Sequence, residues 1–273
     1  MQPKMVRCNL PMQRRSDGFL LQEVKKLCDA GTLQKALLFA HHMENLGCPP
    51  STKVFSSLLQ ACTHQKDIHT GREVYSWITR SGFHNVFLRN QLIRMFSSCG
   101  SLIDASRAFS HIHEHNVFAC SAMILSYVNH GYAEHAVELY YQMIHCNIRS
   151  DGHAFVGVIK ACSLASSLSD GMLIHSHVFE SSFELDIHVC NTLIDMYGRF
   201  GHLYDAHNVF NLVPKKDIVT WNSLIGGCSQ WLMGQEALQY FRKMQDERIK
   251  PDAITLVHIL KVCRSQETLD VGK

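Results

Sequence analysis

Apolar residues recur along the chain with the spacing of one face of a helix. Within 218–252 two such stripes follow each other. Their residues are Trp221, Leu224, Ile225 and Cys228, then Ala237, Leu238, Phe241 and Met244. Spacings of i, i+3, i+4 and i+7 are those of a helix that buries one face. In four places a glycine separates the stripes, and glycine tolerates the positive φ with which a helix ends. These turn glycines are Gly31, Gly100, Gly131 and Gly201. The pattern predicts an all-α chain of helical hairpins.

The hairpins repeat. The segment NQLIRMFSSCGSLIDASRAF, which begins at Asn90, aligns without a gap on NTLIDMYGRFGHLYDAHNVF, which begins at Asn191. A second set of segments ends in cysteine, and a third pairs 121–143 with 222–244. The cysteine-ended segments are FSSLLQAC at 55–62, FVGVIKAC at 155–162 and LVHILKVC at 256–263. The predicted units are 17–51, 52–85, 86–116, 117–151, 152–186, 187–217 and 218–252, with a partial unit at 253–273. Because a hairpin of about 35 residues cannot bury both stripes alone, neighbouring units must stack as a solenoid.

Composition adds few constraints. The chain has 273 residues and a formal charge of +2, and no apolar run is long enough for a membrane span. Its eleven cysteines are scattered without a Cys-x-x-Cys pair, which favours reduced intracellular thiols. Cys62, Cys162 and Cys263 each end an apolar stripe, so we interpret them as small core residues. His111, His113 and His115 alternate and cannot share one helical face, so we expect no metal site and no cofactor.

The first 16 residues hold Lys4, Arg7, Arg14 and Arg15 and no acidic residue. That bias is typical of an organellar transit peptide, while a disordered leader or a fragment boundary would explain it equally. No zinc-deaminase motif (H-x-E followed by P-C-x-x-C), phosphate loop or G-x-S-x-G elbow occurs, so we expect no enzyme. Because the last unit is incomplete, we expect a truncated form or a partial gene product.

The units resemble the pentatricopeptide repeat. The segment 219–252 resembles its ordinary form, 191–217 its short variant and 155–186 its long variant. Their alternation is similar to the plant PLS subclass, many of whose members direct C-to-U editing of organellar transcripts. The signature of tetratricopeptide repeats, W-x2-L-G-x2-Y, is absent.

The resemblance implies a right-handed superhelical solenoid that binds single-stranded RNA sequence-specifically in a mitochondrion or chloroplast. It implies a role in RNA editing or processing, without a deaminase-like (DYW) domain, so that a separate deaminase or auxiliary protein would act in trans. A scaffold that binds other proteins is the alternative.

The resemblance also implies which side chains read bases, since such repeats read one base per unit. The fifth and last residues of a unit face the base edge, and the second stacks on the base. The reading pairs are Asn90 with Asn116, Ser121 with Asp151, Asn191 with Asp217, and Asn222 with Asp252. The stacking residues are Phe87, Phe118, His188 and Val219. By the family's code, units three to seven prefer 5'-C-G-x-U-U-3', where x faces Val156 and Asp186.

Three features qualify this interpretation. Unit 17–51 has Leu21 and Ser51 at its fifth and last positions, and this pair suits a repeat that caps the solenoid better than one that reads a base. Phe87 and Phe118 could instead pack between neighbouring helices. The charge of +2 is modest for a protein whose affinity would depend on phosphate neutralisation.

Overall fold

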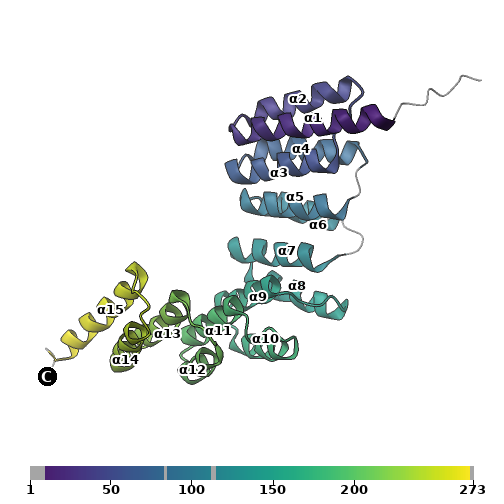
Figure 1. Cartoon of the computed structure of the whole chain (residues 1–273). Helices are drawn as coiled ribbons and strands as arrows, with labels where there is room; N and C mark the ends of the chain where they lie inside the picture. The colour runs from purple at the N-terminus through teal and green to yellow at the C-terminus, as the bar shows by residue number, and fades with distance from the viewer. Residues whose placement is uncertain (1–9, 83–84, 112–114, 271–273) are drawn as a thin grey trace, which may run out of the picture. The chain divides into compact units, whose positions relative to one another are not determined.

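The computed structural model describes residues 10–82, 85–111 and 115–270, and for 10–17 and 265–270 only the backbone. Within these ranges the chain forms fifteen helices and no strand (Figure 1). The first eight are α1 (Leu10–Asp29), α2 (Leu33–Asn45), α3 (Thr52–Gln65), α4 (Ile68–Arg80), α5 (Val86–Ser98), α6 (Leu102–Ser110), α7 (Val117–Asn129) and α8 (Ala133–His145). The others are α9 (Gly152–Leu164), α10 (Leu168–Glu180), α11 (Ile187–Arg199), α12 (Leu203–Leu212), α13 (Ile218–Gln230), α14 (Gly234–Asp246) and α15 (Ala253–Asp270).

The chain divides into two compact units, residues 1–126 and 127–273, with the border inside α7. These two are called the first unit and the second unit, while the repeat units are named by their residue ranges or as units three to seven. In each unit the odd-numbered helices pack on one another as a layer. In the first unit α3 lies between α1 and α5, and in the second α11 and α13 lie between α9 and α15. An even-numbered helix packs behind its odd-numbered partner, as α2 does on α1 and α12 on α11. Contacts between neighbours therefore build the fold, and the predicted all-α repeat architecture is confirmed.

Helix starts follow the repeat. Every odd-numbered helix from α3 to α15 begins at the first residue of a predicted unit, for example α5 at Val86 and α13 at Ile218. The division into units remains our proposal, and these starts support it. Helix α1 begins at Leu10, so the backbone of 10–16 is helical, while the assignment of 1–16 as a disordered leader or transit peptide stays a prediction. Pro11 lies in the first turn, where a missing N–H breaks no helical hydrogen bond. Residues 1–9 lie outside the described part.

The apolar stripes form the core. Trp221, Leu224, Ile225 and Cys228 are each at most 2% exposed. Cys62 and Cys162 are fully buried, as predicted, whereas Cys263 is only half-buried. Burial raises the pKa of both the Cys62 and the Cys162 thiol to about 12, so these groups stay protonated at neutral pH. None of the ten described cysteines forms a disulfide.

Glycines shape both the turns and the helix contacts. The four predicted turn glycines have positive φ, between 74° and 79°. Gly71 of α4 faces Met95 of α5, so that a Cβ there would lie 2.7 Å from the Met95 Sδ. Gly171 and Met196 repeat this arrangement in the second unit. A buried methionine thus occupies the space that the glycine leaves open.

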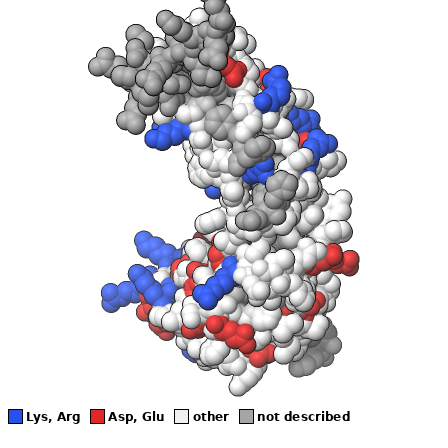
Figure 2. Space-filling view, turned by 90° about the vertical axis from the view of Figure 1, so that its right-hand side faces the viewer, with Lys and Arg blue, Asp and Glu red and all other residues white. Residues whose placement is uncertain are grey.

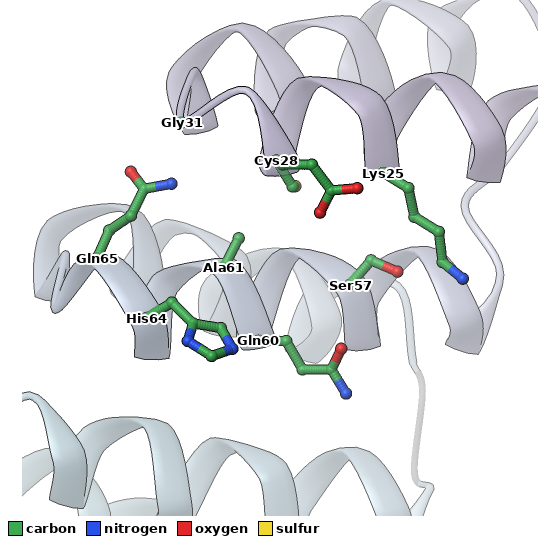
Figure 3. A pocket seen from close by; sticks show the side chains of 9 residues that line it. Lys25, Cys28, Gly31, Ser57, Gln60, Ala61, His64 and Gln65 are labelled. Atoms are coloured by element: carbon green, nitrogen blue, oxygen red, sulfur yellow. The ribbon is translucent and has the colours of Figure 1, made fainter.

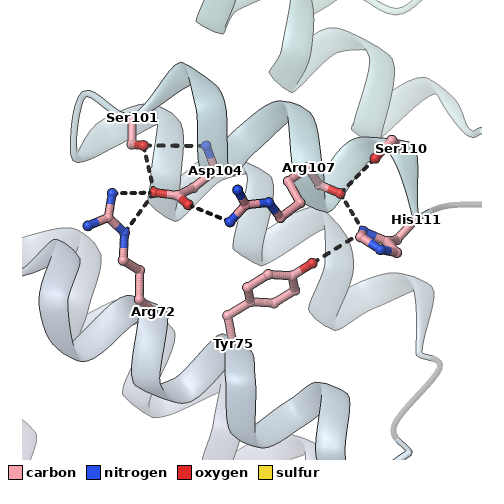
Figure 4. A network of polar contacts seen from close by, with 7 residues as sticks. All are labelled: Arg72, Tyr75, Ser101, Asp104, Arg107, Ser110 and His111. Carbon is pink, nitrogen blue, oxygen red and sulfur yellow. Dashed lines mark hydrogen bonds and ion pairs between the residues drawn. The ribbon is translucent and has the colours of Figure 1, made fainter.

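Histidines serve as hydrogen-bond partners between helices. In the second unit the Tyr140 hydroxyl lies 3.0 Å from the His177 Nδ1, and the Tyr240 hydroxyl lies 2.9 Å from the His207 Nδ1. His111, one of three closely spaced histidines, lies beside Tyr75 in the first unit (Figure 4). His115 stacks on Phe109, while His113 lies outside the described residues. No group of three or more potential metal ligands occurs among the residues described.

A buried carboxylate joins α4 to α6 in the first unit (Figure 4). Asp104 is 4% exposed and accepts hydrogen bonds from Arg72 and from the Ser101 hydroxyl. Burial alone would raise the pKa of Asp104, but these hydrogen bonds and the charge of Arg72 hold it below its ordinary value. The network stabilises the layer of even-numbered helices. None of the described helices is both long and apolar enough to span a bilayer.

Candidate nucleic-acid interface

Three of the four predicted reading pairs are joined by hydrogen bonds. The Asn191 Nδ2 donates to the Asp217 Oδ1 at 3.2 Å, and the Asn222 Nδ2 donates to the Asp252 Oδ1 at 3.0 Å. In the first unit the Asn90 Nδ2 lies 3.4 Å from the Asn116 Oδ1. The last residue of each pair therefore orients the amide of the fifth residue.

The fourth pair is divided between the two units, so Ser121 and Asp151 are described separately. Ser121 is 4% exposed, and its hydroxyl donates to the Val117 carbonyl one turn earlier in α7 at 2.7 Å. A helical serine commonly makes this bond to its own backbone. Asp151 is half-buried at the start of α9.

The last residues also act as helix caps. Asp151, Asp217 and Asp252 accept a backbone N–H from the third residue of the following helix, at 2.8 Å in each case. Asn116 does the same for α7 at 2.9 Å. Capping alone would favour Asp or Asn here. The hydrogen bond to the fifth residue is a separate contact that a cap does not require.

Hydrogen bonding keeps one of these carboxylates ionised. Burial by itself would raise the pKa of Asp217, but hydrogen bonds from Thr220 and Asn191 bring it below the ordinary value. Asp217 is therefore an acceptor at neutral pH. With its carboxylate engaged by Asn191, the remaining donor of the Asn191 amide can meet a base edge.

The predicted stacking residues are exposed. Phe87 is 53% exposed, Phe118 66% and Val219 51%, and His188 is also exposed. Phe87 and Phe118 therefore lie outside the core. Each residue lies at the second position of an odd-numbered helix, three residues before a reading residue. An exposed aromatic ring is a suitable platform for a nucleobase.

Charge separates by layer in the second unit. The odd-numbered helices α9, α11 and α13, with the described side chains of α15, carry four basic residues and one acidic residue. The even-numbered helices α8, α10, α12 and α14 carry two basic and seven acidic residues. The basic residues of the odd-numbered helices are Lys160, Arg199, Lys261 and Arg264. At the height of α8 to α15 in Figure 2, basic side chains project at one edge and acidic ones spread over the neighbouring surface. Among the residues inside the helices, the odd-numbered layer is thus the more basic one, while Asp151, Asp186, Asp217 and Asp252, which directly precede these helices, add four carboxylates.

Lys160 and Lys261 are well placed to contact phosphate. Each is exposed, makes no ion pair with the residues described, and lies one helical turn after the fifth residue of its unit. Arg199, by contrast, pairs with Asp195 at 2.7 Å. The modest net charge of the chain does not show this difference between the helices of the two layers.

A polar groove of about 560 Å³ opens between α1 and α3 in the first unit (Figure 3). The Lys25 side chain reaches from α1 toward α3, where Gln60 and His64 complete the polar lining. Burial raises the pKa of the Cys28 thiol to about 11, so this residue adds no charge or nucleophile. The groove offers both donors and acceptors on the odd-numbered layer.

Other positions in the repeat register differ in character. Val156, the fifth residue of unit 152–186, is half-buried, and its partner Asp186 caps α11. Sequence reasoning missed Ser56 and Asn85, which hold the fifth and last positions of unit 52–85. Ser56 is half-buried and Asn85 is exposed. The same register that selected the other pairs would have found this one.

Comparisons with known proteins agree with the repeat. Three family models match the chain: the PPR repeat at 118–148, the pentatricopeptide repeat domain at 173–228 and the PPR repeat family at 216–264. A pentatricopeptide repeat-containing protein of Arabidopsis thaliana is 31% identical over 88% of this chain and 33% of its own length. A chloroplastic relative from the same plant is 31% identical over 91% of the chain and 29% of its own length. A mitochondrial one is 29% identical over 94% of the chain and 34% of its own length.

The solved structure of the pentatricopeptide repeat protein PPR10 from maize has the same fold, with a TM-score of 0.75 at 16% identity. The match covers 91% of this chain and 36% of the maize protein. The complex of PPR10 with an 18-nt psaJ RNA element matches with a TM-score of 0.74 at 16% identity, over 92% of this chain and 39% of PPR10. The chain spans about a third of the length of these relatives. Repeat models, relatives and fold together show that the chain belongs to the pentatricopeptide repeat family.

Proposed function

We propose that this chain binds single-stranded RNA along its odd-numbered helices and reads one base with each unit. The observation that carries the proposal is the hydrogen bond between fifth and last residues, found in Asn90, Asn191 and Asn222. It orients a donor and acceptor group beside an exposed second residue. The exposed Lys160 and Lys261 on odd-numbered helices of the second unit support a polyanionic ligand.

The proposed base preference for units three to seven is 5'-C-G-x-U-U-3'. An amide can donate and accept, which suits a pyrimidine edge, while the smaller hydroxyl of Ser121 leaves room for a purine. The apolar Val156 supports a permissive position at x. Phe87, Phe118, His188 and Val219 would stack on successive bases.

We propose an organellar, PLS-type protein that takes part in RNA editing or processing. The names of its relatives, which include chloroplastic and mitochondrial proteins, support an organellar site of action. PPR10, seen in complex with an RNA element, supports RNA as the ligand class. In this proposal the chain supplies recognition, and a deaminase or auxiliary protein supplied in trans performs any reaction.

Binding to short RNAs tests this function. We expect the chain to bind 5'-CGAUU-3' within a longer unstructured oligomer more tightly than the same oligomer with its guanine replaced by uracil. Equal affinity for both would refute the base assignment. Binding to neither, together with capture of peptides on the same helices, would favour the protein scaffold instead.

One substitution tests the register. Asn222→Ser should move the preference of the seventh unit from uracil toward guanine, because a hydroxyl replaces the amide at the reading position. Circular dichroism checks that helicity is retained. A folded variant with unchanged preference would show that Asn222 does not face the base.

A further inference from the structure

Two reading pairs with the same sequence have different surroundings. In both Asn191–Asp217 and Asn222–Asp252 the amide nitrogen donates to the carboxylate. The difference lies at the amide oxygen. The Asn222 Oδ1 accepts a hydrogen bond from the Thr255 hydroxyl at 2.6 Å. The Asn191 Oδ1 is buried and has no partner among the described residues, although Asn191 is only 6% exposed.

Thr255 has a close counterpart in Thr220, which occupies the same place after Asp217. Each hydroxyl accepts the backbone N–H of its own aspartate at 3.2 Å. The same hydroxyls lie 2.8 Å and 2.9 Å from the aspartate Oδ1, and both threonines are fully buried. Among the contacts of the described residues, only the one with Asn222 distinguishes Thr255 from Thr220.

The contact with Thr255 determines whether the reading amide must break a hydrogen bond when it turns toward a base. A buried carbonyl without a partner carries a desolvation penalty, so Asn191 loses nothing on the carbonyl side when it moves to the open face. Asn222 must give up or share its bond to Thr255. Two units with the same code should therefore discriminate to different degrees.

We infer that Thr255 is a specificity-determining residue that holds the Asn222 amide inward and weakens base discrimination by the seventh unit relative to the sixth. The inference rests on the proposed function, because it concerns how strongly a reading residue engages its base. It assigns this role to a side chain from the following helix, α15, outside the pair itself.

The test compares discrimination at two positions of one oligomer. In 5'-CGAUU-3', replacing the fourth base by guanine probes the sixth unit, and replacing the fifth probes the seventh. For the unaltered chain we expect the larger loss of affinity at the fourth base. Thr255→Val removes the hydroxyl at nearly constant volume and should raise discrimination at the fifth base about two- to tenfold, the net worth of one hydrogen bond.

Matched variants separate this effect from helix capping. Thr220→Val loses the same contacts to its aspartate and should leave discrimination at the fourth base unchanged. Thr255→Ser keeps the hydroxyl and should behave as the unaltered chain. If Thr255→Val does not fold, Thr255→Ala removes the hydroxyl without added bulk.

Equal discrimination at both bases in the unaltered chain would overturn the inference. So would a folded hydroxyl-free variant at residue 255 with unchanged discrimination. Loss of discrimination at every base, in every variant and in the unaltered chain, would instead refute the proposed function.

Discussion

The helices α11 and α13 meet backbone to backbone at two glycines. A Cβ built on Gly227 would lie 2.9 Å from the Gly198 Cα and 3.2 Å from the Leu203 Cδ2. A backbone atom cannot move aside as a flexible side chain can. We therefore expect Gly227→Ala to push the two helices apart.

The magnitude follows from two opposing contributions. Overpacking of a tight core contact costs about 1 to 3 kcal/mol, while alanine in a helix interior is favoured over glycine by about 1 kcal/mol. Gly227→Ala should therefore be destabilising by up to about 2 kcal/mol. Gly226 is the matched control in the same helix. A Cβ there would meet the His258 ring at 3.1 Å, and this half-buried ring can turn, so Gly226→Ala should be neutral or stabilising.

Urea denaturation followed by helical circular dichroism measures the difference between the variants. Hydrogen exchange of amides in α11 and α13 localises it, since a repeat array can open in parts. A Gly227→Ala chain as stable as the Gly226→Ala chain would refute the proposed backbone contact. The same helices carry Asn191 and Asn222, so their separation also sets the spacing of two proposed reading residues.

Three further predictions concern charge and stacking. Lys160→Ala and Lys261→Ala should each lower the slope of log Kd against log salt for RNA by about 0.7, while Arg242→Ala on the even-numbered layer should not; equal effects from all three would contradict the layer assignment. The pKa of Asp217 is lowered in the folded chain, so its carboxylate stabilises the folded state above about pH 4. This contribution is lost as the pH falls through the folded pKa. The urea midpoint should thus fall less steeply on acidification in Asp217→Asn, and an identical pH profile would argue against this. Phe118→Ala should weaken RNA binding by about 1 to 3 kcal/mol without changing the denaturation midpoint, since the ring is 66% exposed; a lowered midpoint would indicate a packing role.

Local periodicity predicted most of the fold correctly. The stripe of Trp221, Leu224, Ile225 and Cys228 is buried, and Gly31 and Gly201 turn the chain with positive φ, as their spacing indicated. These features depend on neighbouring residues and on the covalent limits of the backbone. The start of α1 was missed because the basic bias of the first 16 residues was taken as a leader, although nothing after Pro11 breaks a helix before Gly18.

The candidate site was predictable in position but not in detail. The repeat register located Asn191 and Asn222, and the resemblance supplied their role. No sequence pattern indicated that the Thr255 hydroxyl reaches Asn222 while Thr220 leaves Asn191 alone. A difference of this kind depends on how α15 sits on α13, which the two matching threonines do not reveal.

By itself, the amino-acid sequence determined the helical hairpins, their repetition and the family, because these depend on periodic burial and on similarity along the chain. Tertiary structure decided which surfaces the hairpins leave open. Within the helices of the second unit it placed four basic residues and one acidic residue on the layer of the reading side chains and seven acidic residues on the other layer, a difference that a net charge of +2 cannot show. The reason is that electrostatic and hydrogen-bond partners are set by distance in space, and stacked helices bring together residues that are about 30 positions apart in the chain.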